Sequence, residues 1–400
     1  MTDVFPRTRA AGCPLDPDPD YAALHAKSSL PKVSCPAGID AYLVTDYDQI
    51  RTALGNPNLS SHGASSMHTQ VGYDFSAPVT TGNIIQLDGS AHARIRKLLI
   101  SEFTVRRMRA LKPYIQRIIN EHIDAMLDKA PGPVDLVSQF ALPIPSLVIC
   151  EMLGVPYGDR DLFQRHGATL TDFDLPVPDK DKAVQELTGY LAELTGRKLA
   201  NPSEDDLLGR LILRARESGA DLTPAELTEL GLILLIAGHE TTANMIGLGT
   251  LTLLSHPEEF ARLRADPSLA ESAVEELLRY LTVVQFGLLR LATGDVEVAG
   301  QRIEAGEWLI GAIAAGNRDE HVYPDPDTLD IGREARTHLA FGFGVHQCIG
   351  QQLARVELRE VLGILYQRMP DMRLAAPIEE LPFKSGGVVY GVKSLPITWG

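Results

Sequence analysis

The sequence predicts a mainly α-helical fold with small β-sheets, formed by a single domain over residues 1–400. Apolar residues recur at three- and four-residue spacing through most of the chain, which is the period of an amphipathic helix. Segments with the two-residue period of a strand are few and short. A chain of 400 residues with 44% hydrophobic and 22% charged residues fits a large globular domain and excludes a disordered or collagen-like chain.

The predicted helices follow one another through the chain, at 46–54, 90–100, 105–127, 136–153, 182–199, 225–254, 259–264, 270–281 and 348–368. The longest begins after Thr223-Pro224 and ends at His256-Pro257. It is apolar on all sides, so we expect it to be buried inside the protein. His239 and Glu240 at its centre argue against a membrane span.

Short runs of branched residues predict strands at 41–45, 288–292, 296–298, 308–314 and 387–392. Two irregular stretches, 55–87 and 172–181, lie between predicted helices. Long loops in compact domains are either functional lids or plain surface excursions, and the composition of these two does not separate the alternatives.

The charge and cysteine pattern limits the possible partners. Lys and Arg number 37 and Asp and Glu 52, which gives a net charge of −15 and makes nucleic acid a poor partner. Four cysteines, Cys13, Cys35, Cys150 and Cys348, are too scattered for a zinc knuckle or a disulfide framework. The first residues lack an apolar signal segment, so we expect a cytoplasmic protein that binds no membrane.

The most specific motif is the segment Phe341-Gly-Phe-Gly-Val-His-Gln-Cys348-Ile-Gly350. Gly350 is too far from Gly342 and Gly344 for a dinucleotide-binding fingerprint, and no parallel βαβ pattern surrounds it. The glycines instead predict a loop that brings Cys348 to the start of a helix. Unpaired N–H groups and the positive helix end favour the thiolate there, which is the form that binds metals. Glycine also lets a large flat ligand approach the backbone.

This segment resembles the F-x-x-G-x-[H/R]-x-C-x-G signature of the cytochrome P450 family at every fixed position. The resemblance implies the cytochrome P450 fold, with haem b buried between the long central helix and the helix after the cysteine. It makes Cys348 the ligand of the haem iron, since thiolate ligation is an established feature of this family. The alternative for Cys348 alone is an inert buried cysteine. The loop residues implied in cofactor binding are Phe341, Gly342, Gly344, His346 and Gly350.

A second motif, AGHETT at 237–242, lies at the centre of the long helix. A zinc-protease motif would need histidine at 243, where alanine stands. The motif resembles A-G-x-[D/E]-T-[T/S], which the family places over the distal face of the haem. The resemblance implies that Glu240 and Thr241 hold water and pass protons to bound O2, and that Ala237 and Gly238 lie against the cofactor. The alternative is a kinked helix whose hydroxyls bond back to the preceding turn.

A third motif is Glu276-Leu-Leu-Arg279, whose spacing puts both charges on one helix face. On an exposed helix this would be an ordinary ion pair that contributes little to stability. The family uses E-x-x-R as a structural lock with a later arginine, which the resemblance identifies as Arg333.

The two haem propionates need cationic or N–H partners. The residues at matching family positions are His92, Arg96, Arg290 and His346. His92 and Arg96 are four residues apart and share one helix face. Before His92 the family often has Asp-Pro-Pro, whereas here Asp88 is followed by Gly89 and Ser90. Solvated surface charge is the alternative for each of the four residues taken alone.

The resemblance implies a monooxygenase that inserts one atom of O2 into a hydrophobic small molecule by hydroxylation or epoxidation. The substrate-facing segments would be 55–87, 172–181 and three apolar groups of residues. Their apolar side chains favour a natural product or xenobiotic with few polar anchors. Plain core residues are the alternative. The members of the three groups are Ile233, Leu234, Val283, Val284, Phe286, Leu288 and Val388.

Electrons must come from a partner, because the sequence shows no flavin or iron–sulfur segment. The segment 94–112 carries seven basic residues against Glu102, and Arg355 and Arg359 follow the cysteine loop. We expect this face to dock an acidic ferredoxin, which a ferredoxin reductase supplies with electrons. The seven are Arg94, Arg96, Lys97, Arg106, Arg107, Arg109 and Lys112.

Three other functions are weighed against monooxygenation. The first stays within haem-thiolate chemistry, as an oxidative coupling enzyme or a peroxide-driven peroxygenase, but Glu240-Thr241 favours O2 activation over peroxide use. The second is a haem-binding protein without turnover, which should carry an output module that the sequence lacks. The third is a cysteine-nucleophile hydrolase, for which no histidine outside the haem motifs has a suitable context.

Overall fold

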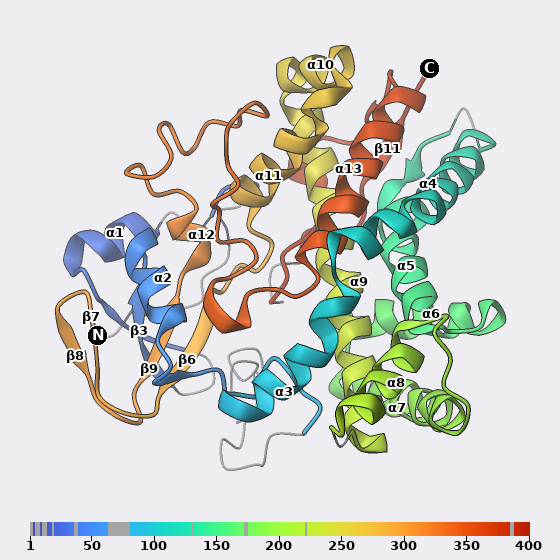
Figure 1. The fold of residues 1–400 in the computed structure, drawn as a ribbon. Coiled ribbons are helices and arrows are strands. Elements are labelled where there is room, and N and C mark those ends of the chain that lie inside the picture. Colours follow the sequence, from blue (N-terminus) through green and yellow to red (C-terminus); the bar gives the residue numbers. More distant parts are fainter. Residues whose placement is uncertain are drawn as a thin grey trace.

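The computed structural model describes residues 3–4, 9, 14–17, 20–35, 39–62, 81–129, 132–171, 175–220, 222–384 and 388–400. Helices form the larger part of the molecule, and a smaller part rich in strands lies at one side (Figure 1). The prediction of a mainly α-helical fold with small sheets is confirmed.

Helices occur throughout the chain, and Figure 1 labels them where there is room. They are α1 (Asp20–Lys27), α2 (Tyr47–Gly55), α3 (Gly89–Leu99), α4 (Val105–Leu127), α5 (Pro143–Leu153), α6 (Arg160–Thr171), α7 (Val177–Ala200), α8 (Leu207–Ser218), α9 (Pro224–Ser255), α10 (Pro257–Ala265), α11 (Ala270–Leu281), α12 (Ile313–Gly316) and α13 (Gln351–Arg368).

Two of the predicted helices differ from the structure in ways that prolines explain. The segment 136–153 is not continuous, because Val137–Ala141 forms a π-helical turn and α5 begins at Pro143. Pro143 and Pro145 lack the N–H that a continuous α-helix needs at these positions. The helix expected at 182–199 begins earlier, at Val177, where Pro178 fits the first turn.

The described residues form three sheets, of which the one containing β11 lies among the helices, beside α13 (Figure 1). The largest has the order β1-β2-β3-β9-β6-β4, in which β3 and β9 run parallel and β9 and β6 antiparallel. The second has the order β10-β11-β5, and β7 and β8 form a hairpin. The strands are β1 (Asp3–Val4), β2 (Lys32–Ser34), β3 (Asp40–Val44), β4 (Leu59–Ser60), β5 (Val134–Asp135), β6 (Leu288–Ala292), β7 (Val296–Val298), β8 (Gln301–Ile303), β9 (Trp308–Gly311), β10 (Arg373–Leu374) and β11 (Pro396–Thr398).

Two predicted strands are shorter than expected. The strand expected at 308–314 ends at Gly311, because the chain turns into the short helix α12. Within 387–392 the described residues form only isolated bridges, from Val389 to Val284 and from Val392 to Phe383. Residue 387 itself lies outside the described residues.

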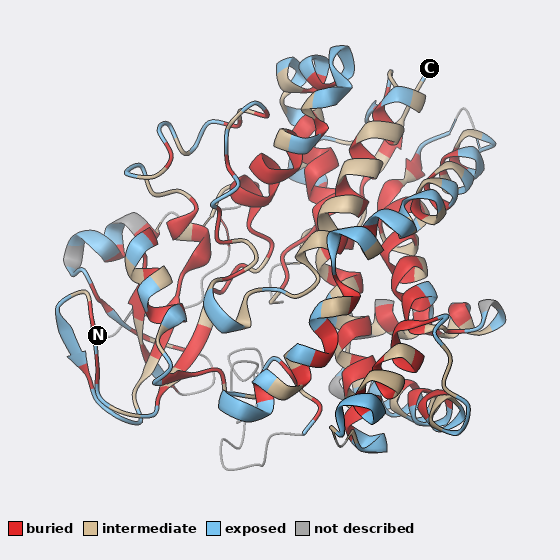
Figure 2. Ribbon diagram, viewed as in Figure 1, coloured by how far each residue is buried: buried red, intermediate tan, exposed pale blue. Residues whose placement is uncertain are grey.

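Helix α9 runs through the centre of the molecule beside α13, and its residues are mostly buried (Figures 1 and 2). Its start is fixed by a capping box. The Thr223 hydroxyl accepts the N–H of Glu226 at 3.2 Å, and the Glu226 carboxylate accepts the N–H of Thr223 at 2.9 Å. The start predicted from Thr223-Pro224 is therefore confirmed.

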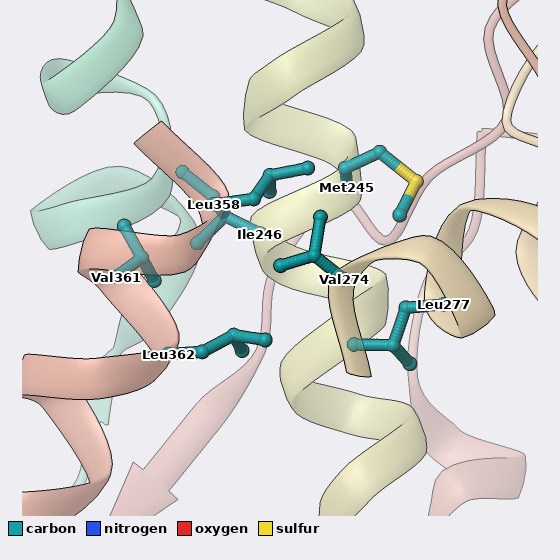
Figure 3. Close-up of a pocket in the computed structure, with 7 residues that line it drawn as sticks. All are labelled: Met245, Ile246, Val274, Leu277, Leu358, Val361 and Leu362. Atoms are coloured by element: carbon teal, nitrogen blue, oxygen red, sulfur yellow. The ribbon is translucent and has the colours of Figure 1, made fainter. Parts of the chain in front are cut away.

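Aliphatic side chains fill the junction of α9, α11 and α13, where seven residues line a small apolar pocket (Figure 3). None of these seven is a predicted site residue, and we assign the junction to the core. Among the described residues, no helix combines the length and apolarity needed to cross a membrane. The seven are Met245, Ile246, Val274, Leu277, Leu358, Val361 and Leu362.

Candidate functional site

The cysteine loop before α13 is shaped by two glycines. Gly342 and Gly344 have φ angles of 68° and 77°, a region that favours glycine. A Cβ on Gly344 would stand 2.7 Å from the carbonyl oxygen of Leu54, so no larger residue fits there. The N–H of Cys348 donates to the carbonyl of Phe341 at 2.8 Å and closes the loop. The loop therefore holds Cys348 two residues before Gly350, the N-cap of α13.

Opposing effects act on the Cys348 thiol. Burial is the largest and raises its pKa, whereas the N–H groups of Gly350 and Gln351 and the charges of Arg96 and Arg355 lower it. The start of α13 thus lowers the pKa of the thiol, as predicted. In the polypeptide by itself, however, the rise in pKa caused by burial is larger. Cys348 nevertheless remains solvent-accessible as a residue. A bound metal cation would supply the missing stabilisation, because metal coordination deprotonates a thiol.

Three nitrogen-bearing side chains of α3 and β6 form no ion pair with a carboxylate of the described residues, although Asp88 acts on Arg290 at longer range. Arg290 is buried and donates to the carbonyl of Leu289 at 2.8 Å, and burial lowers its pKa to about 10. Arg96 donates to the carbonyl of Gln347 at 2.8 Å. Neither arginine forms an ion pair within the described part of the chain. The buried Nε2 atom of His92 has no hydrogen-bond partner among the described residues. The two arginine cations and the His92 imidazole fit the two propionates of haem b, which need cationic or N–H partners.

His346, the fourth predicted propionate residue, has a carboxylate partner. Its Nε2 atom lies 3.0 Å from Asp88 Oδ1 and 3.1 Å from the hydroxyl of Ser61. The rings of His92 and His346 lie 4.2 Å apart. Burial, together with the charges of His346 and Arg96, lowers the pKa of His92 to about 4 against the opposing charge of Asp88. His92 is therefore a neutral donor or acceptor at neutral pH, while His346 is tied to Asp88.

The centre of α9 presents two different environments. Ala237 is exposed and Thr241 half-buried, and their four-residue spacing places both on one face. The Thr241 hydroxyl donates to the carbonyl of Ala237 at 2.8 Å, so it is bonded back to the preceding turn of α9. A Cβ on Gly238 would be in ordinary van der Waals contact with Ile149 of α5 at 3.4 Å, so Gly238 lies against α5.

Glu240 lies on the buried side of α9. Burial raises its pKa to about 7, and the nearby Lys384 and Asn244 oppose this rise. Lys384 Nζ is 3.7 Å from Glu240 Oε1. The Oε1 atom accepts no hydrogen bond from any described residue. The adjacent His239 ring makes contact with the Leu142 carbonyl at 3.1 Å.

The structure brings Glu276, Arg279 and Arg333 together in the interior. Two nitrogens of Arg279 donate to the Glu276 carboxylate at 2.8 Å each, and both side chains are 0% exposed. Arg333 Nε donates to Glu276 at 3.1 Å. Arg279 also donates to the carbonyls of Asn317 and Pro326 at 2.9 and 2.8 Å. This cluster joins α11 to the segment before the cysteine loop.

The structure does not gather all predicted substrate-facing residues at one place. Ile233, Leu234, Val283 and Val388 belong to or contact the main helical core. Phe286 instead lies in a separate cluster under the large sheet, with residues of β3 and β9, so it is a core residue of that sheet. Leu288, by contrast, lies near the cysteine loop, since a Cβ on Gly342 would be 3.3 Å from it. Val284 pairs with Val389. Of the predicted substrate loops, 63–80 and 172–174 lie outside the described residues.

Several important contacts could not be found from the sequence. The Glu240–Lys384 pair and the His346–Asp88 pair each join distant segments, and no local spacing signals them. Arg355 binds both oxygens of Glu275 at 2.7 and 3.0 Å and lies 4.6 Å over the ring of Phe341. The last contact connects α11 and α13 to the cysteine loop.

Comparisons with known proteins agree with this geometry. A family model described as Cytochrome P450 matches residues 177–369. Cytochrome P450-SU2 of Streptomyces griseolus is 43% identical over 403 residues, covering 99% of this chain and 97% of its own. The Vitamin D3 dihydroxylase of Streptomyces griseolus is 44% identical over 399 residues, with 99% and 97% covered. The crystal structure of CYP105P1 in complex with filipin I has a TM-score of 0.93 at 43% identity, covering 100% of this chain and 99% of that chain.

The similarity extends over nearly the whole chain in sequence and over the whole chain in structure. The resemblance inferred from the cysteine loop is therefore confirmed, as are haem b as cofactor and O2 as co-substrate. The chain belongs to the cytochrome P450 family and is a monooxygenase of that family.

Proposed function

We propose that Cys348 ligates the haem iron and that Arg96, Arg290 and His92 hold the propionates. The observation that carries this proposal is that Arg96, Arg290 and His92 form no ion pair with a described residue, and that Arg96 lies close enough to the accessible Cys348 to act on its thiol. When bound, the haem supplies reductive activation of O2, and thiolate ligation supports cleavage of the O–O bond. His346 contributes indirectly, because its bond to Asp88 fixes the loop next to Cys348.

Glu240 and Thr241 supply protons in this proposal. One atom of O2 enters the substrate and the other leaves as water, so two protons must reach the site. A carboxyl with a pKa of about 7 exchanges its proton readily at neutral pH. The Thr241 hydroxyl donates its hydrogen bond to the Ala237 carbonyl, so the hydroxyl oxygen can accept a hydrogen bond from water. Glu240 therefore delivers protons and Thr241 positions the water that carries them.

The proposed substrate is a hydrophobic small molecule, hydroxylated or epoxidised at an unactivated carbon. Apolar side chains from α9, from the segment before β6 and from the C-terminal segment support this class. One relative is named for Vitamin D3 dihydroxylation and another was solved in complex with filipin I, which supports a small organic molecule as substrate. We place the reaction in the cytoplasm, where the unpaired Cys35 and Cys150 would stay reduced.

The proposed electron donor is an acidic ferredoxin, with a ferredoxin reductase behind it. Lys97, Arg106 and Arg109 are exposed and form no ion pair with a described residue. Three large apolar residues are also exposed. Ile100 and Val105, which lie between Lys97 and Arg106 in the sequence, are 56% and 49% exposed, and Val345 of the cysteine loop is 66% exposed. Cations around exposed apolar residues suit a transient acidic partner. Arg96 donates to the Gln347 carbonyl, and the remaining basic residues are paired with carboxylates, namely Arg94, Arg107, Lys112, Arg355 and Arg359.

Cys348→Ala tests the proposed ligand. The wild-type ferrous carbonyl complex is expected to show the red-shifted Soret band of anionic sulfur ligation, and the variant is expected to lose it. Cys150→Ala is the matched control, because Cys150 is buried in the core and should leave the band unchanged. A red-shifted band that survives in Cys348→Ala would refute the assignment. Product analysis under labelled O2 separates insertion from oxidative coupling, and peroxide-driven turnover separates a peroxygenase.

Charge reversal tests the docking face. Arg106→Glu with Arg109→Glu is expected to slow reduction by ferredoxin at low salt about tenfold or more, because steering by charge is lost. The control Arg302→Glu reverses an exposed charge on the β7–β8 hairpin and should have no effect. Equal reduction rates for all three proteins at low salt would refute this face.

A further inference from the structure

Lys384 approaches the acid of α9 from the C-terminal part of the chain. Its Nζ atom is 3.7 Å from Glu240 Oε1, and the two side chains are only 10% and 8% exposed. This distance makes an ion pair without a direct hydrogen bond. A lysine is rarely buried to this extent without a charged partner. The position of Lys384 next to Glu240 therefore needs an explanation beyond surface charge.

The backbone around Lys384 holds it rigidly towards α9. The N–H of Lys384 donates to the carbonyl of Gly391 at 2.8 Å, and the N–H of Lys393 donates to the carbonyl of Pro382 at 2.7 Å. The rings of Phe383 and Tyr390 stack at 5.7 Å. The pairing of 382–384 with 391–393 thus fixes the Cα of Lys384 and leaves its side chain to reach Glu240.

The same pairing packs closely against the turn of α9 after Glu240. Asn244 donates to the backbone carbonyl of Glu240 at 2.9 Å. A Cβ on Gly391 would stand 1.7 Å from Asn244 Oδ1, so only glycine permits this approach. The N–H of Gln285 donates to the carbonyl of Val388 at 3.1 Å, so this segment also contacts the predicted substrate side. The segment therefore connects the acid of α9 with residues proposed to face the substrate.

We propose that Lys384 is a positioning residue for Glu240, holding its carboxylate ionised and oriented between successive proton deliveries. This inference rests on the proposed function of Glu240 as the proton donor. The ammonium attracts the carboxylate without hydrogen bonding to it, so Oε1 can still accept a proton from water. Without this charge, burial would leave a neutral carboxyl that holds its proton too firmly to release it near neutral pH.

The surrounding charges support this assignment. Of the groups that act on Glu240, Lys384 carries the charge and Asn244 is neutral, and both lower its pKa against the rise caused by burial. His239 is the adjacent titratable residue, but burial lowers its pKa to about 4, and its ring contacts the carbonyl of Leu142, just before α5. His239 is therefore uncharged at neutral pH, and the positive charge near Glu240 comes from Lys384.

Infrared spectroscopy of the ferric holoenzyme tests the proposal without turnover. The C=O stretch of protonated Glu240 is identified by its absence in Glu240→Gln, and its intensity is followed against pH. Lys384→Met is expected to raise the midpoint of this titration by about one to three pH units, because an opposite charge is lost. Lys384→Arg should restore the wild-type midpoint, and Lys393→Met is the matched control for losing a lysine from the same segment.

Two results separate this inference from the proposed function. An unchanged midpoint in Lys384→Met and in Lys384→Gln, with the band still absent in Glu240→Gln, would overturn the role of Lys384 alone. The share of electrons recovered as product should fall several-fold in both Lys384→Met and Glu240→Gln. Unchanged recovery in Glu240→Gln would instead refute Glu240 as the proton donor. The red-shifted carbonyl band confirms that each variant is folded and loaded with haem.

Discussion

Two buried ion pairs of this protein hold opposite charges in different ways. Glu276 and Arg279 meet through two bonds of 2.8 Å, and Arg333 adds a third at 3.1 Å. Glu240 and Lys384 face each other at 3.7 Å, and one Glu240 oxygen accepts no hydrogen bond from the described residues. A fully bonded pair fixes one arrangement of the chain. A loosely held acid keeps its proton exchangeable, which suits a catalytic task.

Glu276→Gln is expected to have the largest effect, because it removes the charge but keeps the shape. Arg279 is 0% exposed and would remain as a buried cation without its carboxylate. Breaking a buried pair in this way costs about 3–5 kcal/mol. Urea unfolding of the haem-loaded protein, followed by far-UV circular dichroism, measures the loss.

The control for this experiment is Arg117→Gln on α4. Arg117 pairs with Glu121 at 2.8 Å, but the two side chains are 54% and 55% exposed. Exposed pairs of this kind contribute little to stability. We therefore expect its unfolding curve to match the wild type. Equal losses in Glu276→Gln and Arg117→Gln would show that burial does not distinguish the Glu276 pair.

The pH dependence of stability gives the second largest effect. Burial raises the pKa of folded Glu240 from 4.5 to about 7, so the folded state binds more protons than the unfolded state in this window. The contribution of Glu240 to stability is therefore greatest below about pH 4.5 and is lost as the pH rises towards about 7. Glutamine does not ionise, so Glu240→Gln does not lose stability in this way as the pH rises.

The difference between variant and wild type measures the Glu240 contribution alone. We expect the free energy of unfolding of Glu240→Gln, relative to wild type, to rise by about 2–3 kcal/mol between about pH 5 and pH 8. Urea unfolding at several pH values gives both curves. Parallel curves over this range would show that folded Glu240 has an ordinary pKa, and the contrast with Glu276 would then disappear.

Local sequence signals predicted most of the fold. The start of α9 is encoded by Thr223, Pro224 and Glu226, three residues within one turn, and the cysteine loop by glycines at fixed spacing. Helix α8 was not predicted, although Asp206 caps its start and Gly219 ends it with φ of 66°. Its signal is therefore present in the sequence. The π-helical turn before α5 depends on tertiary packing as well as on the prolines, and apolar spacing alone does not reveal it.

The candidate site was predicted as a set of residues but not as a set of contacts. Helix and loop motifs placed Glu240 and Cys348 correctly on α9 and before α13, because each motif is local. The partners Lys384 and Asp88 come from distant segments, which only the tertiary fold brings together. Phe286 is a second example. From the sequence, an apolar side chain is equally compatible with a substrate pocket and with the core, and the structure places Phe286 in the cluster under the large sheet.

Lys384→Met is expected to have the smallest effect on stability. It completes the comparison by removing the cation of the Glu240–Lys384 pair. Glu240 can take up a proton when Lys384 is lost, so no uncompensated charge remains in the interior. The 3.7 Å pair also has no direct hydrogen bond to lose. We expect a loss of about 1 kcal/mol or less in the urea assay at about pH 7.5, where most of the Glu240 carboxyl of the wild type is ionised. A loss as large as that of Glu276→Gln would mean that the Lys384 pair also maintains the fold, and that looseness of geometry does not separate a catalytic ion pair from a structural one.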